Sequence, residues 1–247
     1  MEVTEREKWA LITGAGRGIG AAIARRFAAE GVNLILHYFR SEQEIRKVEK
    51  DCREHGVQVY LIQANLTKVN GAEGLVESCP ISPDILVFNA GLSHYGLIQE
   101  ITPVQWEELM NIHVRTPFFL AQKALPKMIQ RKWGRIVTIS SIWGVTGASF
   151  EVLYSTAKGA LVAFTKALAK EVAPSGITVN SVAPGLIETD MVLSAFSPED
   201  LEGITADIPA SRMGKPEEVA ALVSFLTKEE AGYINGQVIS LNGAWYT

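Results

Sequence analysis

A phenol and an ammonium group lie four residues apart in this sequence, at Tyr154 and Lys158. Residues at that spacing lie on one face of a helix, where their side chains are neighbours. A free phenol has a pKa of about 10, and an adjacent cation favours the phenolate. Ser141 stands thirteen residues before the tyrosine, just after a predicted buried strand. Because ligands bind at the carboxyl edge of a parallel sheet, these side chains predict proton-transfer chemistry at that edge.

A glycine-rich segment follows the first predicted strand and runs directly into an apolar helical pattern. It reads Thr13-Gly14-Ala15-Gly16-Arg17-Gly18-Ile19-Gly20. Glycines at such a place allow a tight turn and close approach of the backbone, and the helix N-terminus offers free N–H groups to a pyrophosphate. The spacing is G-x-x-x-G-x-G, and the commoner G-x-G-x-x-G is met only if Ala21 replaces its last glycine. This context predicts a dinucleotide site, with a glycine turn that binds nothing as the alternative.

The end of the second predicted strand bears on which nicotinamide would bind. In doubly wound NAD enzymes a carboxylate there accepts hydrogen bonds from the ribose 2'-hydroxyl, but this sequence reads His37-Tyr38-Phe39-Arg40-Ser41, without an acid. A 2'-phosphate favours cations and hydroxyls instead, which Arg17, Arg40 and Ser41 would supply. The sequence therefore favours NADP(H) over NAD(H). The alternative is that both arginines are ordinary surface charges.

The elements that must position these residues follow from the pattern of apolar runs. Seven short runs predict buried strands, at residues 9–13, 33–38, 58–63, 85–88, 134–140, 178–182 and 237–241. Helical stretches between them begin near Gly18, Glu42, Lys68, Pro103, Phe150 and Pro216. Strands that alternate with crossover helices predict a Rossmann-type, doubly wound parallel sheet with helices on both faces. Residues of about 185–210 have weak periodicity and predict a lid over a substrate site.

Composition limits the class of protein. At 247 residues and 47% hydrophobic, the chain predicts one domain over residues 1–247. With 23 basic and 27 acidic residues and no run of Lys and Arg, nucleic acid is not an expected partner. No apolar signal segment or membrane span is predicted, so we expect a cytoplasmic protein. Neither cysteine has motif spacing, and no cluster of Cys, His, Asp and Glu predicts a metal site.

Further motifs follow in a fixed order along essentially the whole chain. After the glycine segment come Asn89-Ala90-Gly91, then Asn111, then Ser141 and Tyr154-x-x-x-Lys158. The motifs occur in the order that is seen in the short-chain dehydrogenases/reductases, and the sequence therefore resembles that family. Within that family it looks most like the 3-oxoacyl-[acyl carrier protein] reductases, through Gly134–Val137, Ile177–Asn180 and Pro184–Met191.

The resemblance implies a role for each catalytic candidate. Hydride that reaches a carbonyl carbon leaves an alkoxide, which needs a proton and a stabilising donor. Tyr154 would be the acid, its pKa lowered by Lys158, and Ser141 would donate to the substrate oxygen. Lys158 would also bind the nicotinamide ribose, and Asn111 would position a water that connects the lysine to solvent. The alternatives are a helix or turn cap for Ser141 and a bond to neighbouring backbone for Asn111.

The resemblance also implies cofactor contacts beyond the glycine segment. Asn65 stands where the family often has an Asp on the adenine side, and Leu66 would lend a backbone group; a turn-forming Asn65 is the alternative. Asn89, Ala90 and Gly91 resemble the family's Asn-Asn-Ala-Gly, with Phe88 in place of the first Asn. The expected cofactor-binding residues are Gly14, Arg17, Gly18, Ile19, Gly20, Tyr38, Arg40, Ser41, Asn65, Leu66, Asn89, Ala90, Gly91, Tyr154, Lys158, Pro184, Gly185, Ile187 and Thr189.

The substrate is less determined than the chemistry. The resemblance implies a 3-oxoacyl thioester of fatty acid biosynthesis. A reductase of another ketone stays open, on a sugar, a steroid-like ring, a polyketide or a protein, such as aminopentanone on elongation factor P. A second alternative also stays open, in which the protein is a regulator that binds NADP(H) but catalyses no reaction. The pocket is expected to be rimmed by His94, Tyr95, Trp143, Val145, Phe150 and Phe196.

The resemblance also bears on partners. In the carrier-protein reductases two basic residues flank the active-site entrance, and here the matching positions are Lys132 and Ser175, so one cation is missing. We therefore expect docking of a carrier protein to contribute less than usual. A homotetramer is implied, built from the helix that bears Tyr154 and from the apolar C-terminal segment 243–247.

Overall fold

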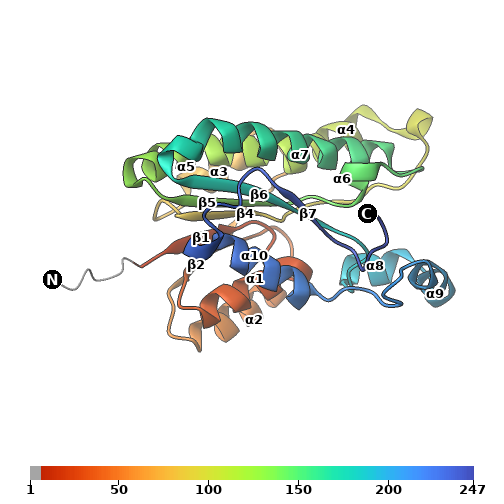
Figure 1. The fold of residues 1–247 in the computed structure, drawn as a ribbon, viewed down its shortest axis with the longest axis horizontal. Coiled ribbons are helices and arrows are strands. Elements are labelled where there is room, and N and C mark those ends of the chain that lie inside the picture. The colour runs from red at the N-terminus through yellow and green to blue at the C-terminus, as the bar shows by residue number, and fades with distance from the viewer. Residues whose placement is uncertain (1–6) are drawn as a thin grey trace.

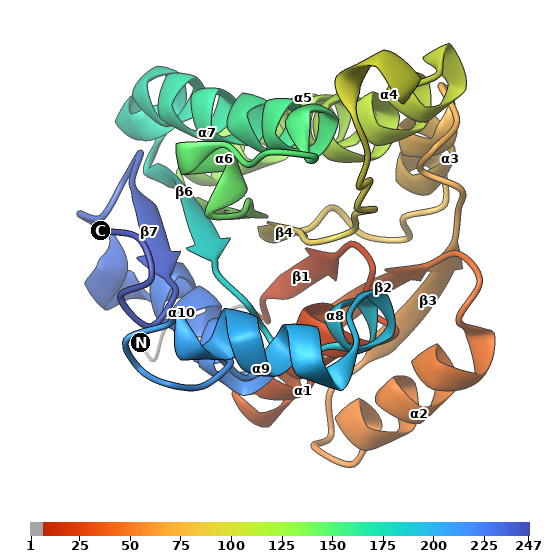
Figure 2. The ribbon, with the colours of Figure 1, turned by 90° about the vertical axis from the view of Figure 1, so that its right-hand side faces the viewer.

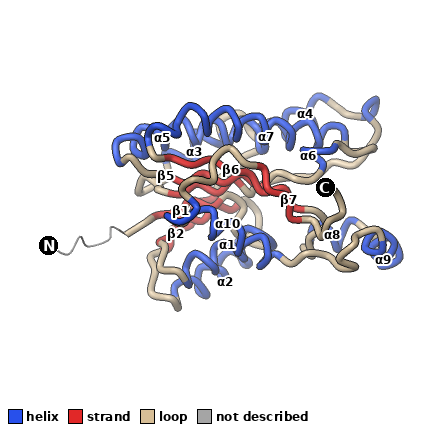
Figure 3. Tube along the Cα trace, viewed as in Figure 1, coloured by secondary structure: helices blue, strands red, loops and turns tan. Residues whose placement is uncertain are grey.

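The computed structural model describes residues 7–247 and is built around a parallel sheet (Figures 1 and 3). The strand order is β3-β2-β1-β4-β5-β6-β7, and every neighbouring pair is parallel. The strands are β1 Trp9–Ile12, β2 Asn33–Tyr38, β3 Val59–Gln63, β4 Ile85–Phe88, β5 Gly134–Ile139, β6 Ile177–Pro184 and β7 Val238–Leu241. The predicted seven-stranded, doubly wound fold is confirmed.

Helices cover both faces of the sheet (Figure 1). One layer contains α1 Gly18–Ala29, α2 Glu42–Arg53 and α10 Pro216–Thr227, and the other contains α3 Gly71–Glu77, α4 Pro103–Met110, α5 Thr116–Arg131 and α7 Val152–Val172. Each layer closes over its own apolar cluster against the sheet. Because helices cover both faces of the sheet, β1, β2, β4, β5 and β6 are buried along their whole length.

The helix predicted from Pro103 contains an irregular turn that the sequence pattern did not reveal. Between α4 and α5, residues Asn111–Arg115 form one π-helical turn, in which the Thr116 N–H bonds to the Asn111 carbonyl. Pro117 follows at the second position of α5 and has no N–H to continue a regular ladder. Such turns are rare and frequently occur at functional sites.

The segments beyond the carboxyl ends of the strands complete the fold (Figure 2). Within the expected lid lie two helices, α8 Asp190–Ala195 and α9 Pro198–Ala206. They lie beside the α1 layer, while α4 and the short α6 Trp143–Thr146 belong to the other layer (Figures 1 and 2). Short 3₁₀ turns occur at Ile98–Glu100, Ala173–Ser175 and Glu229–Ala231. Within the described residues, no helix has the length and apolar character to cross a bilayer.

Candidate active site at the carboxyl edge of the sheet

The glycine segment after β1 is fixed by close backbone contacts. A Cβ on Gly20 would lie 2.2 Å from the Gly14 carbonyl oxygen, and one on Gly14 would lie 2.9 Å from the Cα of Ala90. Gly14 also has a φ of +67°, in the left-handed region that favours glycine. The turn leads straight into α1, whose first N–H groups have no partner inside the helix. A backbone cradle at a helix N-terminus fits a pyrophosphate, as the sequence predicted.

Asn89 ties this loop to the end of β4. Its Nδ2 donates to the carbonyl oxygens of Thr13 and Gly14, both at 3.0 Å. The Thr13 hydroxyl oxygen accepts in return from the N–H groups of Asn89 and Ala90, also at 3.0 Å. The Asn89 amide therefore shapes the loop through its own side chain, a role that the sequence analysis had not assigned to it.

His37, at the end of β2, makes a second bridge that the sequence analysis missed. Its Nδ1 accepts from the Gly14 N–H at 3.0 Å, so its Nε2 carries the proton and donates to the Ala64 carbonyl at 3.0 Å. Burial lowers the pKa of this imidazole to about 4, which keeps it neutral. The ring thus joins the phosphate loop to the segment after β3. A histidine inside an otherwise apolar strand was the available signal.

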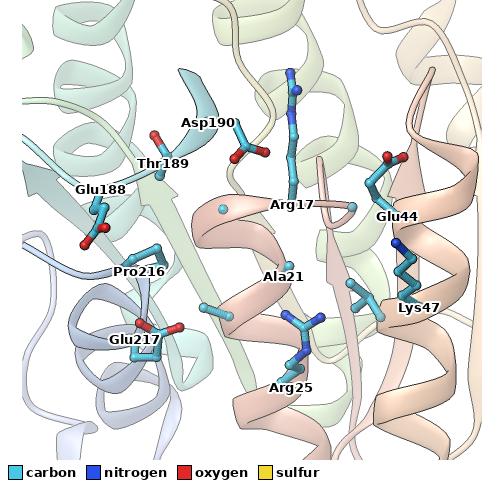
Figure 4. Close-up of a pocket in the computed structure, with 14 residues that line it drawn as sticks. Arg17, Ala21, Arg25, Glu44, Lys47, Glu188, Thr189, Asp190, Pro216 and Glu217 are labelled. Carbon is cyan, nitrogen blue, oxygen red and sulfur yellow. The ribbon is translucent and has the colours of Figure 1, made fainter. Parts of the chain in front are cut away.

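The residues expected at a 2'-phosphate gather near the same loop. A Cβ on Gly16 would lie 3.2 Å from that of Ser41, so the loops after β1 and β2 are in contact. The Arg40 guanidinium lies over the Phe39 ring at 5.1 Å, and both residues are exposed. Arg17 projects beside a hollow of about 350 Å³ between α1, α2 and the segment Glu188–Asp190 (Figure 4). By contrast, the Tyr38 side chain is only 8% exposed and belongs to the core.

Tyr154, Ser141 and Lys158 come together beyond the end of β5. The Ser141 hydroxyl lies close enough to the Tyr154 phenol to lower its pKa as a hydrogen-bond donor. The Lys158 ammonium lies 5.5 Å from the centre of the Tyr154 ring and donates to the Ile139 carbonyl at 2.8 Å. Gly144 permits this packing, because a Cβ there would lie 2.7 Å from the backbone carbon of Lys158. The Ser141 hydroxyl oxygen also accepts from the Trp143 N–H at 3.2 Å, which is a turn-capping contact.

The pKa of Tyr154, beside Ser141 and Lys158, differs from what the sequence predicted. The pKa of Tyr154 lies above its usual value, first because the phenol is buried and second because Glu151 is nearby, while the Ser141 hydrogen bond acts in the opposite direction. Burial lowers the pKa of Lys158 to about 7. The expected lowering of the phenol pKa by the lysine is therefore not observed. A phenol in this environment holds its proton at neutral pH and is suited to donate it.

Asn111 and His113 occupy the π-helical turn beside this trio. The Asn111 amide donates to the Thr67 carbonyl at 2.9 Å, so it bonds to neighbouring backbone. The buried His113 ring lies edge-on to Tyr154, with 5.7 Å between ring centres, and its Nε2 lies 2.8 Å from the Leu92 carbonyl oxygen. A Cβ on Gly91 would lie 2.4 Å from this ring. His113 was not predicted, although it stands two residues after Asn111.

The remaining predicted cofactor contacts line the loops after β3 and β6. Asn65 makes a turn, because its Oδ1 accepts from the Thr67 N–H at 3.1 Å, and the Leu66 side chain is buried. Gly185 approaches Asn242, whose Cβ would lie 2.8 Å from a Cβ on the glycine. Thr189 lies against the phosphate loop, since its methyl carbon would be 3.2 Å from a Cβ on Gly18. Pro184 ends β6, and Ile187 is buried beside Gly214.

Two aromatic groups contain residues that were expected to rim the substrate pocket. The rings of Tyr95 and Phe150 stack, with 5.2 Å between their centres. Trp143 packs against Trp245 and Tyr246 at 5.5 and 5.4 Å. The C-terminal segment, which was expected to be buried between subunits, thus contacts α6 of its own chain. His94 and Phe196 are partly buried, and Val145 is exposed.

Lys132 and Ser175, the two positions matched to the carrier-docking residues, do not lie beside the active site of their own chain. Lys132 precedes β5 and Ser175 precedes β6, whereas Ser141 follows β5. Since these strands are parallel, Lys132 and Ser175 lie at the amino edge of the sheet. Tyr154 and Ser175 are separated by almost the whole of α7, which is 21 residues or about 30 Å long. The prediction that the pair flanks the entrance is therefore wrong for a single chain.

Comparison with known proteins agrees with this arrangement. The family model described as short chain dehydrogenase matches residues 8–200. The chain is 46% identical over 240 residues to the uncharacterized oxidoreductase YmfI of Bacillus subtilis, covering 97% of this chain and 99% of that one. It is 41% identical over 249 residues to the 3-oxoacyl-[acyl-carrier-protein] reductase FabG of Aquifex aeolicus, with 100% of both chains covered. A blue fluorescent protein from a metagenomic library, solved in complex with NADPH, superposes with a TM-score of 0.89 at 31% identity over 97% and 98% of the two chains.

Proposed function

The chain belongs to the short chain dehydrogenase family, and on that premise we propose that it uses NADPH to reduce a ketone to an alcohol. The resemblance seen in the sequence is thereby confirmed, and the protein is an oxidoreductase. The observation that carries the proposal is the grouping of Tyr154, Ser141 and Lys158 beyond the end of β5. These three lie at the same edge of the sheet as the glycine cradle for the dinucleotide.

The proposed reaction divides the work among these residues. NADPH, when bound, supplies the hydride to the carbonyl carbon. Tyr154 gives its phenol proton to the oxygen that becomes the alcohol, and Ser141 donates a hydrogen bond to that oxygen. Lys158 would bind the ribose hydroxyls of the cofactor. Its buried ammonium, with a pKa near 7, would also help to return a proton to the tyrosine.

Several features support NADPH over NADH. Phe39 and Arg40 stand after β2 in place of the carboxylate that would accept bonds from a ribose 2'-hydroxyl. Arg17, Arg40 and Ser41 lie around one loop junction and would donate to a 2'-phosphate. The NADPH complex of the structural relative agrees with this assignment for the present chain.

For the substrate we propose a 3-oxoacyl thioester as the first ketone to test. The similarity to the Aquifex reductase over the full chain supports it, as does the exposed apolar surface of Val145 and Phe150. The amino-edge position of Lys132 and Ser175 gives no carrier docking site at the entrance within one chain. A homotetramer and a single domain over residues 1–247 stay predictions.

The test is NADPH oxidation at 340 nm with one 3-oxoacyl group presented on a carrier protein and on a small thiol, and with free ketones beside them. Turnover of either thioester supports the substrate proposal. Turnover of free ketones alone would reject the thioester and keep the reductase. If NADPH binds but no ketone is reduced, the chain is a binder of the cofactor and the proposed function is wrong.

A further inference from the structure

A buried histidine with one unused nitrogen lies beside the proposed acid. The His113 side chain is 1% exposed, and its Nδ1 has no hydrogen-bond partner among residues 7–247. Its other nitrogen, Nε2, lies 2.8 Å from the carbonyl oxygen of Leu92 and 3.1 Å from the Leu92 nitrogen. Because a carbonyl oxygen only accepts, the shorter contact places the proton on Nε2 and leaves Nδ1 as an acceptor. A buried acceptor of this kind is unfavourable until a ligand or a water molecule donates to it.

Three observations place this ring among the catalytic groups. It stands edge-on to the Tyr154 ring, with 5.7 Å between the ring centres. A Cβ on Gly91 would lie 2.4 Å from Cε1, the ring carbon between the two nitrogens. Burial holds the pKa of His113 well below its usual range, and the charge of Lys158 acts in the same direction. The ring therefore stays neutral at pH 7 and keeps Nδ1 as an acceptor.

Asn111 and His113 both belong to the π-helical turn but differ in their surroundings. The turn packs against α7, the helix that carries Tyr154 and Lys158. The Asn111 amide donates away from that helix, to the Thr67 carbonyl in the loop after β3. His113, by contrast, contacts the Tyr154 ring and retains an acceptor that the chain does not use. Of these two side chains, His113 is therefore the one placed to serve the catalytic tyrosine and lysine.

We propose that His113 is a positioning residue for proton return, whose Nδ1 orients the water molecule that delivers a proton to Lys158. This inference rests on the proposed ketone reduction and gives to His113 the task that the sequence predicted for Asn111. In each turnover Tyr154 gives its proton to the alkoxide oxygen, and the Lys158 ammonium returns one to the phenolate. The water then donates a proton to the neutral Lys158 amine while its second hydrogen stays on Nδ1, and bulk solvent replaces the donated proton. The imidazole keeps its charge throughout this cycle.

Two amide variants separate the roles of the two ring nitrogens. An asparagine side chain places its amide near the position of Nδ1, whereas the longer glutamine side chain reaches the position of Nε2. His113→Asn should therefore keep kcat for the best ketone of the substrate screen within about threefold of the native value. His113→Gln retains only the contact with Leu92, and its kcat should fall by about tenfold to a hundredfold.

The solvent deuterium isotope effect on kcat is the second measurement, because a purely structural role of His113 would not change it. It should rise in His113→Gln and in His113→Phe, where proton return becomes the slow step, and stay native in His113→Asn. NADPH affinity and thermal melting check that each variant is folded. His55→Phe is the control, since His55 is exposed after α2 and its loss should leave kcat and the isotope effect unchanged.

The outcomes separate this inference from the proposed function. A kcat for His113→Asn as low as that for His113→Gln, or native turnover in His113→Gln, would overturn the role of Nδ1 while ketone reduction stands. So would a loss of kcat in His113→Gln without a change in the isotope effect. If the native protein reduces no ketone and no thioester, both the proposed function and this inference are wrong.

Discussion

The two sides of the site are built in different ways. On the cofactor side, Gly14 and Gly20 lie so close to neighbouring main chain that a side chain cannot fit at either position. The buried His37 ring also joins the loop after β1 to the segment after β3. On the substrate side, the rim residues Tyr95, Val145 and Phe150 are all exposed. The cofactor side therefore depends on backbone geometry, whereas the choice of substrate depends on surface side chains.

The largest effect is expected from one added methyl group on the cofactor side. Gly20→Ala places a Cβ 2.2 Å from the Gly14 carbonyl oxygen and 2.5 Å from the Asn89 Nδ2. We expect a loss of about 3 kcal/mol in unfolding free energy, from overpacking, and NADPH affinity reduced at least about a hundredfold. Fluorescence titration with NADPH and urea unfolding measure both effects.

Gly74→Ala is the matched control for that change. Gly74 lies within α3, and a Cβ there would meet nothing within 4 Å. Alanine should stabilise the helix by about 0.5–1 kcal/mol and keep NADPH binding. Native NADPH affinity in Gly20→Ala would show that the glycine cradle does not hold the cofactor.

A second test uses pH on the His37 bridge. Its pKa is about 4 in the folded chain and about 6.5 when unfolded, so the unfolded chain takes up a proton first as pH falls. The stability from the neutral ring is complete above pH 6.5 and should decrease by about 2 kcal/mol by pH 5. Buried His113 adds to the same trend, because its pKa is also lowered.

Urea unfolding between pH 5 and 7.5 measures this slope. His37→Asn removes the titrating group but retains an acceptor and a donor, so the pH dependence should become shallower. Replacing the exposed His55 by Asn should leave the slope unchanged. An equal slope in native protein and His37→Asn would contradict a neutral, buried bridge.

A third change sharpens the electrostatics of the cofactor side. Phe39→Asp puts a carboxylate after β2, where it should repel a 2'-phosphate and accept from a 2'-hydroxyl. The ratio of kcat/KM for NADPH to that for NADH should fall about tenfold to a hundredfold. Phe39→Asn, neutral and of the same shape, isolates the charge from loss of the ring under Arg40. An unchanged ratio would place the 2'-phosphate elsewhere.

The smallest effect is expected on the substrate rim. Phe150→Asn should relieve backbone strain, because asparagine tolerates the φ of +62° at this position better than phenylalanine does. The same change removes the ring that stacks on Tyr95. The relief of strain stabilises the fold and the loss of stacking destabilises it, each by about 1 kcal/mol. The unfolding free energy should therefore change by less than about 1 kcal/mol. NADPH affinity should stay within about twofold. A loss as large as that of Gly20→Ala would erase the contrast between the two sides.

The same contrast explains how much the sequence could predict. Strands buried on both faces are rich in apolar residues, and glycines at Gly14 and Gly20 reflect close backbone contacts, so both could be recognised from residue types. The parallel direction of the strands followed from the crossover helices. Tyr154 and Lys158 could be paired because helical spacing places them on one face.

Other features depend on contacts between distant segments. The π-helical turn places the His113 ring edge-on to Tyr154, and this turn has no periodic signal. The partners of His37 are Gly14 and Ala64, which are 23 and 27 residues away. Only the three-dimensional arrangement supplies these facts. The amino-edge place of Lys132, by contrast, already followed from the predicted parallel strands, because Lys132 precedes the strand predicted at 134–140.

The role of Tyr154 as the acid is tested by comparing cofactor binding with turnover in Tyr154→Phe. Removal of one oxygen takes away the proton that the account assigns to the reaction, while the ring still packs against His113. NADPH affinity, measured by fluorescence, should stay within about twofold. The kcat with the best ketone of the substrate screen should fall by about 10²–10⁴. A Tyr154→Phe enzyme that binds NADPH and reduces the ketone at nearly the native rate would contradict the assignment of Tyr154 as the acid.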